Sequence, residues 1–537
     1  MGLRLDNGRW TGGRLSVRRE SHYADRVVDC FADRPRSLHG LLAAAVARNA
    51  SGEALVDGGL RYSWQDLHDL AGRLATGLSI RGVRRGDRVI LFIGNRSDFI
   101  LALFAITRLG AVFVPVSTRA AKPELAYMAN NCGAVGIIFD ADLADRVPDV
   151  KDVPTLKLRM ATTASDGAEV LEAVVAEGPV AAVVDVDEED TAVILYTSGT
   201  TGNPKGAMQT HLNLVHGAMV YVHCLDMTER DRSIVCVPMS HTTGLTALIG
   251  TMTCCAGTMI IMPAFNVREF LDLAERERMT HTVIVPAMYN LCLLQADFES
   301  RDLSAWRVGA FGGAPMPAAT ISRLAEKLPG LGLMNVYGAT ETAAGVTVMP
   351  AVETATHRDS VGRIVPCADI RIMDADGREV PAGETGELWI AGPTVVKGYW
   401  NNPAATAENF TGGYWHSGDL GSIDVHGFVR VFDRKKDMIN RGGYKIYTAE
   451  VENVLSEHLG VVESAVVGKP CPVLGERVHA FVTLREEAVT ADALKAFCAE
   501  RLSDYKVPET FTLLEAPLPR NANGKVMKRQ LRDGLDA

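Results

Sequence analysis

Residues 197–206 combine the chemical groups that bind a polyphosphate. The segment reads Thr-Ser-Gly-Thr-Thr-Gly-Asn-Pro-Lys-Gly and follows an apolar run at residues 192–196. Its glycines let backbone N–H groups turn toward an anion, its hydroxyls add neutral donors, and Lys205 adds a full positive charge. The predicted phosphate loop consists of Thr197, Ser198, Gly199, Thr200, Thr201, Gly202 and Lys205.

The residues that flank Lys205 exclude one common class of phosphate loop. A Walker loop has Ser or Thr directly after its lysine, whereas here Pro204 precedes Lys205 and Gly206 follows it. The segment is therefore not the loop of a P-loop NTPase. Taken alone, it could also be a solvated turn.

Three further charged residues have ordinary interpretations when each is taken alone. Glu341, in the run Asn-Val-Tyr-Gly-Ala-Thr-Glu-Thr at residues 335–342, would be a surface acid. Asp419 in Ser-Gly-Asp would belong to a turn, and Lys525 would be an exposed lysine after an Asn-Gly turn. Gly312 and Gly313 follow a strand-like run at residues 307–311.

The elements that must position these groups follow an alternating pattern. Short apolar runs at residues 88–93, 111–116, 135–139, 192–196, 233–237, 259–262 and 282–285 alternate with amphipathic stretches such as residues 98–109. Continuous β-branched runs between helical patterns indicate strands buried on both faces, and hence parallel α/β sheets. Such sheets bind ligands at the carboxyl ends of their strands.

The pattern changes in the last third of the chain. Residues 359–431 alternate with Gly, Pro and Asp turns, which indicates a smaller antiparallel, barrel-like region, and an α+β pattern follows the charged cluster at residues 433–437. We predict an N-terminal domain of residues 1–435, with doubly wound parallel sheets, and a small mobile α+β domain of residues 436–537.

Composition and charge exclude several function classes. The 537 residues are 47% hydrophobic, with 55 Lys+Arg against 65 Asp+Glu and a formal charge of −10, which disfavours nucleic-acid binding. The ten cysteines show no zinc-ligand spacing and are expected to be reduced thiols. Residues 245–265 carry no charge, but their glycines, threonines and Pro263 favour a buried helix followed by a strand. No export or lipidation signal is apparent, so we expect a cytoplasmic enzyme without stable membrane insertion.

The ordered set of motifs resembles the adenylate-forming superfamily, which includes acyl-CoA synthetases, the adenylation domains of peptide synthetases, and luciferases. The resemblance runs from about residue 41 to residue 528 and begins with the signature at residues 196–206. It implies an AMP-forming acid–thiol ligase that uses ATP and Mg²⁺, with coenzyme A as co-substrate. No protein nucleophile is then needed.

The resemblance also implies roles for individual residues. Tyr337 stacks on adenine, Thr340 contacts the α-phosphate and Glu341 holds Mg²⁺. Asp419 and Arg434 bind the ribose, and Lys525 reaches the reacting carboxylate and α-phosphate. Beyond the loop, the implied ATP/AMP-binding residues are Gly313, Ala314, Pro315, Asn335, Tyr337, Gly338, Thr340, Asp419, Arg434 and Lys525; the implied catalytic residues are Lys525, Thr340, Glu341 and Lys205.

For the thioester step, the resemblance implies a swing of the C-terminal domain. Lys436 is the implied hinge, and Gly442, Gly443 and Tyr444 line the implied coenzyme A tunnel. Relatives often have Pro where this chain has Thr448, which we expect to act as the N-cap of the following helix.

The acid is expected to have an uncharged tail. No Asp or Glu occurs between Asp231 and Glu269, in the region where peptide-synthetase domains place an aspartate for the substrate ammonium. A buried ammonium without a partner would be costly. We therefore expect a fatty or aromatic monocarboxylic acid, with His241 as a gate. The predicted pocket residues are His241, Thr242, Thr243, Met288, Gly312, Val336, Gly338 and Ala343.

Two other functions remain open from the sequence. A free-standing ligase could load a carrier-protein pantetheine instead of coenzyme A, and a degenerate nucleotide-binding sensor would bind ATP without turnover. The expected partners are small molecules, with no nucleic acid, and a homodimer remains open.

Overall fold

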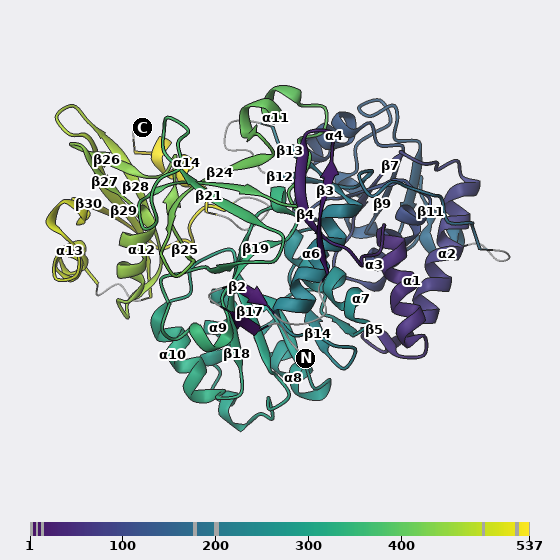
Figure 1. The fold of residues 1–537 in the computed structure, drawn as a ribbon, viewed down its shortest axis with the longest axis horizontal. Helices are drawn as coiled ribbons and strands as arrows, with labels where there is room; N and C mark the ends of the chain where they lie inside the picture. The colour runs from purple at the N-terminus through teal and green to yellow at the C-terminus, as the bar shows by residue number, and fades with distance from the viewer. Residues whose placement is uncertain are drawn as a thin grey trace. The chain divides into compact units, whose positions relative to one another are not determined.

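The computed structural model describes residues 4–6, 9–11, 16–175, 180–197, 203–485, 489–520 and 526–535. The chain divides into two compact units. The first contains Met1–Pro315, Ser322–Ile370 and Ile390–Trp415, and the second contains Met316–Ile321, Arg371–Trp389 and His416–Ala537. Figure 1 shows their elements by label. The predicted boundary at residues 435/436 stays a prediction.

One sheet of the first unit carries the predicted phosphate loop near its edge. Its strand order is β11-β10-β9-β7-β8-β12-β13, parallel throughout except for the final antiparallel pair β12–β13. In β7, the side chains of Val89, Ile90, Leu91 and Phe92 are all fully buried, as expected for a strand covered on both faces. The strands are β7 (Arg88–Phe92), β8 (Val112–Pro115), β9 (Gly136–Phe139), β10 (Leu158–Ala161), β11 (Glu169–Val170), β12 (Thr191–Thr197) and β13 (Lys205–Thr210).

A second sheet of the first unit carries the other predicted site residues. Its strand order is β20-β19-β18-β17-β16-β14-β15-β5-β6, and the run from β18 to β5 is parallel. The strands are β5 (Glu53–Asp57), β6 (Leu60–Ser63), β14 (Arg232–Val235), β15 (Thr258–Ile261), β16 (His281–Ile284), β17 (Val308–Gly312), β18 (Gly332–Gly338), β19 (Gly345–Val348) and β20 (Gly362–Ile364). The parallel α/β architecture predicted from the apolar runs is confirmed.

Helices pack between these two sheets. Helix α3 (Ser97–Arg108) contacts β8 of one sheet, α2 (Trp64–Ile80) contacts β5 and β6 of the other, and α2 and α3 contact each other. Helix α6 (His211–Cys224) contacts both β13 and β19. The other helices are α1 (Leu38–Asn49), α4 (Lys122–Cys132), α5 (Leu171–Val174), α7 (Thr251–Cys255), α8 (Val267–Arg276), α9 (Pro286–Leu293), α10 (Ala318–Lys327) and α11 (Pro403–Asn409).

The uncharged stretch at residues 245–265 forms a buried helix followed by a strand, as predicted. The helix begins as a π-helix, η2 (Thr243–Gly250), continues as α7 and is followed by β15. In the described part of the chain, no helix combines the length and apolarity needed to cross a bilayer. All ten cysteines are free thiols, as expected.

The second unit contains a smaller sheet built on its own core. Strands β26 (Ile439–Arg441), β27 (Tyr444–Ile446), β28 (Val461–Cys471), β29 (Gly475–Leu484) and β30 (Thr510–Leu514) form this sheet. Helices α12 (Thr448–Ser456), α13 (Ala491–Ala499) and α14 (Lys528–Asp533) pack against it. Before them, β24 (Tyr414–Ile423) and β25 (Phe428–Arg434) form an antiparallel pair.

The N-cap prediction for Thr448 is wrong. Helix α12 starts at Thr448 itself, and the residue before it is Tyr447, whose side chain makes no cap bond. The backbone N–H and the hydroxyl of Thr448 both donate to Oδ2 of Asp433. The carboxylate of Asp433, which lies on β25, therefore accepts hydrogen bonds from the backbone N–H and the hydroxyl at the start of the helix.

Asn95 joins the carboxyl ends of the two sheets. Its side-chain amide donates to the carbonyl oxygens of Val237 (2.9 Å) and Met262 (3.2 Å), and its Oδ1 accepts from the N–H of Met239 (2.9 Å). Because the site is buried, leaving these backbone groups unpaired costs about 1–3 kcal/mol for each group. We predict that Asn95→Leu lowers the apparent free energy of unfolding by about 3 kcal/mol or more, measured by urea denaturation. The exposed substitution Asn453→Leu is the control; equal effects of the two would contradict this role.

Buried neutral histidines predict a loss of stability in acid. Nε2 of His216 accepts from the N–H of Phe31 (3.1 Å), while Nδ1 lies 3.0 Å from the carbonyl of Leu212, which fits the neutral ring protonated at Nδ1. Burial lowers the pKa of His216 to about 3 and that of His211 to about 4, from an ordinary value of 6.5. The unfolded chain therefore binds more protons than the folded chain from pH 6.5 down to these values. Stability should fall on acidification by up to about 1.4 kcal/mol per pH unit for each histidine. Unfolding measured between about pH 7 and about pH 5 should show a smaller pH dependence in His216→Gln than in the wild type.

Candidate functional site

The two ends of the predicted phosphate loop lie side by side. Thr197 ends β12 and Lys205 begins β13, and the two residues pair in the antiparallel ladder. The hydroxyl of Thr197 donates to the carbonyl oxygen of Lys205 at 3.3 Å. The other predicted loop residues, Ser198, Gly199, Thr200, Thr201 and Gly202, lie outside the described residues. The loop thus starts and ends on one hairpin.

The segment with Tyr337, Thr340 and Glu341 is attached to the same hairpin. Asn335, Val336, Tyr337 and Gly338 lie on β18, and Thr340 and Glu341 follow in the 3₁₀ turn η4 (Thr340–Thr342). Nε2 of Gln209, on β13, donates to the carbonyl oxygen of Thr340 at 2.9 Å. The predicted α-phosphate and metal residues are therefore held to the strand that begins with Lys205.

Residues 393–400 complete this connection; we call them the 393–400 segment. The N–H of Val396 donates to the carbonyl oxygen of Glu341 (2.9 Å), and the hydroxyl of Tyr399 donates to its Oε1 (2.9 Å). The N–H of Trp400 donates to the carbonyl oxygen of Gly206 (2.7 Å), and Ala207 forms a β-bridge with Tyr399. Nζ of Lys205 lies 5.2 Å from the centroid of the Tyr399 ring, within cation–π range. One segment therefore contacts both charged groups.

The Glu341 carboxylate suits a magnesium ion bound mainly by substrate. Mg²⁺ usually takes one or two carboxylates and completes its shell with phosphate oxygens and water. Among the described residues, Tyr399 is the hydrogen-bond partner of the Glu341 side chain, and its second oxygen has none. Among the described residues, Glu341 belongs to no cluster of acidic, His or Cys ligands.

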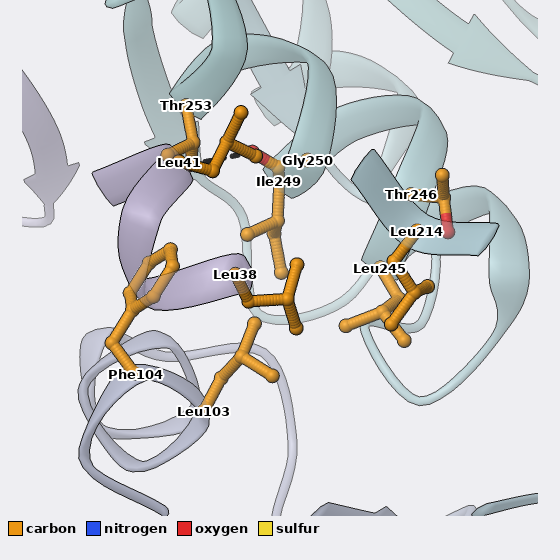
Figure 2. A pocket seen from close by; sticks show the side chains of 10 residues that line it. All are labelled: Leu38, Leu41, Leu103, Phe104, Leu214, Leu245, Thr246, Ile249, Gly250 and Thr253. Carbon is orange, nitrogen blue, oxygen red and sulfur yellow. Dashed lines mark hydrogen bonds between the residues drawn. The ribbon is translucent and has the colours of Figure 1, made fainter. Parts of the chain in front are cut away.

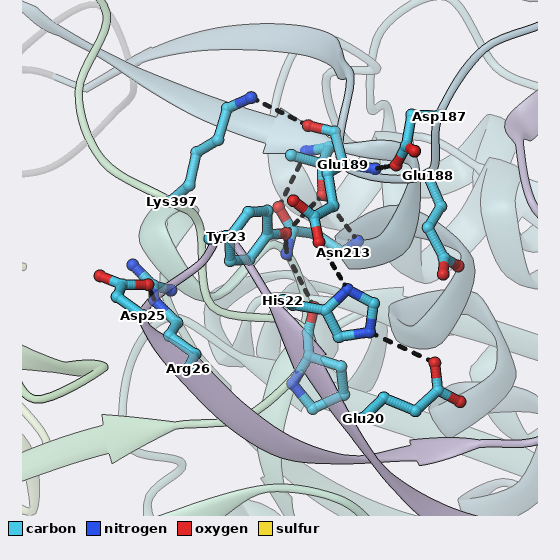
Figure 3. Close-up of polar contacts among 12 residues, drawn as sticks. Glu20, His22, Tyr23, Asp25, Arg26, Asp187, Glu188, Glu189, Asn213 and Lys397 are labelled. Atoms are coloured by element: carbon cyan, nitrogen blue, oxygen red, sulfur yellow. Dashed lines mark hydrogen bonds and ion pairs between the residues drawn. The ribbon is translucent and has the colours of Figure 1, made fainter.

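One cluster of ligand-type side chains does occur in the described chain, and it is a poor metal site. Glu20, His22 and Cys30 lie together in the N-terminal hairpin formed by β3 (Val17–His22) and β4 (Arg26–Phe31). Figure 3 shows two of them, Glu20 and His22. Both oxygens of Glu20 accept from Arg34, at 2.9 and 2.6 Å, and burial raises the pKa of the Cys30 thiol to about 12. A cation would have to displace an arginine and deprotonate that thiol.

The predicted acyl-pocket residues lie at one end of the sheet, where its parallel strands have their carboxyl ends. Strands β18, β17, β16 and β14 are neighbours, and the predicted residues lie at or just after the carboxyl ends of these strands. His241, Thr242 and Thr243 follow β14, Met288 follows β16 in α9, Gly312 ends β17, and Val336 and Gly338 lie on β18. Ala343 follows directly after η4. The hydroxyl of Thr242 is buried without a hydrogen-bond partner among the described residues, which leaves it available to a substrate.

Gly312 and Gly338 are required by the backbone rather than by a ligand. A Cβ on Gly312 would lie 2.4 Å from the carbonyl oxygen of Val336, and one on Gly338 would lie 2.2 Å from that of Ala344. Close strand packing therefore explains both glycines. The exposed loop of Gly313, Ala314 and Pro315 follows β17, whose last two residues, Phe311 and Gly312, pair with Asn335 and Val336 of β18.

A small apolar cavity lies beside this region but is separate from the predicted pocket. It is lined by residues of α1, α3, α6, η2 and α7, among them Leu38, Phe104, Leu214 and Leu245 (Figure 2). None of the predicted acyl-pocket residues lines it. Thr246, on η2, contributes a buried hydroxyl without a partner in the described chain.

In the second unit, the predicted ribose ligands contact each other. Asp419 and Arg434 pair across β24 and β25, and Nε of Arg434 lies 2.7 Å from Oδ1 of Asp419. The Asp419 side chain is 6% exposed and that of Arg434 is 43% exposed. The arginine therefore fixes the orientation of a carboxylate that the sequence assigned to hydroxyl binding.

The predicted tunnel residues form a tight hairpin. Gly442 and Gly443 connect β26 and β27 with φ values of +59° and +91°, a backbone region that favours glycine. The ring of Tyr444 stacks on Tyr505 with centroids 4.6 Å apart. Lys436 lies between β25 and β26, and Lys525 lies outside the described residues.

Two residues of the site were missed by sequence reasoning. Gln209 and Tyr399 hold Thr340 and Glu341 from positions more than a hundred and about sixty residues away. The β-strand pattern at residues 205–210 gives no sign that a glutamine would face a distant turn. Likewise, nothing in the Gly-Tyr-Trp sequence at residues 398–400 indicates that the tyrosine would bind a carboxylate.

Known proteins resemble this chain over most of its length. Residues 42–400 match the family described as AMP-binding enzyme, and residues 450–525 match the AMP-binding enzyme C-terminal domain. The chain is 36% identical over 480 residues to a feruloyl-CoA synthase of Amycolatopsis, covering 89% of this chain and 95% of that protein. It is 34% identical over 481 residues to the long-chain-fatty-acid–CoA ligase FadD13 of Mycobacterium tuberculosis, covering 89% and 94%.

A solved structure extends the likeness to the fold. The o-succinylbenzoate CoA synthetase (MenE) of Bacillus subtilis, in complex with its acyl-adenylate intermediate, aligns with a TM-score of 0.82 at 29% identity. The alignment covers 92% of this chain and 98% of that one. The same enzyme has been solved with ATP and a magnesium ion. The chain therefore belongs to the AMP-binding enzymes, the adenylate-forming family that its motifs resemble.

Proposed function

We propose that this protein is an ATP-dependent acyl-CoA synthetase. It adenylates a hydrophobic monocarboxylic acid, fatty or aromatic, and transfers the acyl group to coenzyme A, releasing AMP and pyrophosphate. The observation that carries the proposal is the attachment of Lys205 and Glu341 to one strand and one loop, within a chain of the AMP-binding family. A lysine and a carboxylate that are attached to the same strand suit a magnesium-bound triphosphate.

The first half-reaction needs charge stabilisation rather than a protein nucleophile. The substrate carboxylate attacks the α-phosphorus of ATP in line with the departing pyrophosphate. Lys205 and the loop amides accept the charge that develops on the pyrophosphate, and Thr340 and Lys525 contact the α-phosphate. Glu341 would hold the magnesium ion, which neutralises phosphate charge when bound. Tyr337, Asp419 and Arg434 orient the adenosine.

The second half-reaction exchanges AMP for a thiol. The coenzyme A sulfur attacks the acyl carbonyl, the bond to the AMP oxygen breaks, and AMP leaves. Lys525 must first withdraw, and we propose that the C-terminal residues turn about Lys436 to allow this. The glycines at 442 and 443 leave space for a thin pantetheine arm.

The acid is proposed from the character of its pocket. The stretch between Asp231 and Glu269 has no acidic residue, and apart from His241 the predicted pocket residues are small, apolar or hydroxyl-bearing. The relatives include ligases named for an aromatic acid and for long-chain fatty acids. A panel of such acids, with pyrophosphate release as readout, identifies the substrate. No pyrophosphate release with any member would contradict the proposal.

Two alternatives are distinguished when thioester and AMP are measured in the same reactions. Thioester formed on a carrier protein but not on coenzyme A would indicate a carrier-loading ligase, and ATP binding without AMP release would indicate a sensor. We also propose a cytoplasmic location and leave a homodimer as an outcome for sedimentation analysis.

The first prediction concerns Lys525. Lys525→Ala should reduce adenylation by about a hundredfold or more, since removal of one preorganised donor typically costs about 3 kcal/mol. A pre-made acyl-adenylate should still be converted to thioester at a near-normal rate, because that step does not use the lysine. Stopped-flow measurement of each half-reaction checks this, and an equal loss in both would contradict the two-conformation scheme.

The second prediction concerns the hairpin at residues 442–443. Gly443→Leu should block thioester formation and spare acyl-adenylate formation, because the side chain would fill the pantetheine path. Since Gly443 has a φ of +91°, the substitution also strains the backbone. Gly377→Leu is the matched control, because Gly377 has a φ of +76° and open space around its Cβ position. Loss of the thioester step in both variants, or in neither, would contradict the tunnel assignment.

A further inference from the structure

The 393–400 segment forms hydrogen bonds with both the backbone and the side chain of Glu341. Val396 binds the carbonyl oxygen of Glu341, and Tyr399 binds its carboxylate. Tyr399 is only 5% exposed and packs with Ala207, Val396 and Ala405 in a small apolar core. Because its ring is enclosed, the hydroxyl cannot turn away from Glu341 without opening a cavity. The carboxylate is therefore held in one direction.

The hydrogen bond between these side chains has a fixed polarity. A carboxylate only accepts, so the Tyr399 hydroxyl must be the donor. The face of the same ring lies 5.2 Å from Nζ of Lys205. One rigid side chain thus sets the positions of a cation and an acid relative to each other.

The N-terminal hairpin, β3 (Val17–His22) and β4 (Arg26–Phe31), holds the 393–400 segment from the other side (Figure 3). Nη1 of Arg26 donates to the carbonyl oxygens of Val395 (3.2 Å) and Val396 (2.9 Å). Nδ2 of Asn213 donates to the carbonyl of Pro393 (2.7 Å) and to the hydroxyl of Tyr23 (3.1 Å). The segment is thereby fastened through its backbone.

The hairpin precedes the part of the chain that matches the family, which begins at residue 42. Arg26 is 6% exposed, and its pKa is lowered by burial, so its contacts with the two carbonyls replace lost hydration. Lys397 adds a bond from Nζ to the carbonyl oxygen of Glu189 at 2.9 Å, which ties the segment to the stretch before β12. The hairpin therefore contacts the 393–400 segment, and this segment in turn contacts Glu341.

We propose that Tyr399 is a positioning residue that aims the Glu341 carboxylate at the magnesium–ATP complex, and that Arg26 of the N-terminal hairpin keeps Tyr399 in place. The inference rests on the proposed function for its reaction, but it concerns binding of the metal. A Tyr399 that served only packing would be replaceable by Phe without effect on the metal.

The decisive variant is Tyr399→Phe, which keeps the ring and removes only the hydroxyl. We expect the Mg²⁺ concentration for half-maximal adenylation to rise about tenfold, because a charge-assisted hydrogen bond is lost. The rate at saturating Mg²⁺ and the KM for the acid should stay within about threefold, since neither depends on this bond. Unchanged Mg²⁺ dependence would overturn the inference.

A binding measurement separates this inference from catalysis. Mn²⁺ bound in the presence of a non-hydrolysable ATP analogue can be titrated by electron paramagnetic resonance. Its Kd should rise about tenfold in Tyr399→Phe and stay unchanged in Tyr289→Phe. Tyr289 is the matched control, because its buried hydroxyl donates to a core carbonyl, that of Ala310 (3.0 Å). Equal Kd values for the two variants would overturn the inference.

The role of Arg26 is tested in the same titration. Arg26→Ala should weaken Mn²⁺ binding, and Arg26→Lys should restore only part of it, since an ammonium can still donate to a carbonyl but lacks the planar fork of the guanidinium. Normal Mn²⁺ binding in Arg26→Ala would overturn the proposed role of Arg26 and the N-terminal hairpin. If the wild type forms no AMP but Tyr399→Phe still weakens Mn²⁺ binding, the proposed function fails and this inference stands. If the wild type forms AMP and Mn²⁺ binding is unaffected, only this inference fails.

Discussion

The pairing of strand β13 with the 393–400 segment is the constraint on which the site in the first unit depends. It sets the distance between a lysine that begins the strand and a carboxylate held by the segment. The Tyr399 ring engages both, so each charge keeps a separate direction. A site that binds a metal and phosphate oxygens needs this separation of charge.

The sheets explain why residues from so many parts of the chain can serve one reaction. Parallel strands place their carboxyl ends along one edge, and the candidate residues after β14, β16, β17 and β18 lie on that edge. Asn95 ties this edge to the end of β7 in the other sheet.

Sequence reasoning was most successful where a local pattern determines the structure. The apolar runs predicted strands β7, β8, β9, β12, β14, β15 and β16, and the uncharged stretch at residues 245–265 proved to be a buried helix and a strand. The π-helical start of that helix was not predictable, because nothing in the residue types distinguishes it from an α-helix. The Thr448 cap failed for a related reason: its partner, Asp433, is brought to it by tertiary structure. Gln209 and Tyr399 escaped notice because their function depends on a contact across the fold.

The roles of Asp419, Arg434 and the acyl-pocket residues stay predictions, and Lys525 and residues 198–202 lie outside the described chain.

The central claim is that the acid's own oxygen bonds to the α-phosphorus of ATP. The most direct test supplies an accepted acid labelled with ¹⁸O in its carboxylate, together with ATP, Mg²⁺ and coenzyme A, and analyses the products by mass spectrometry. Our account predicts one labelled oxygen in AMP, because the bond between the acyl carbon and the bridging oxygen is the one that the thiol breaks. Label in inorganic phosphate with formation of ADP, or no label in AMP, would contradict it.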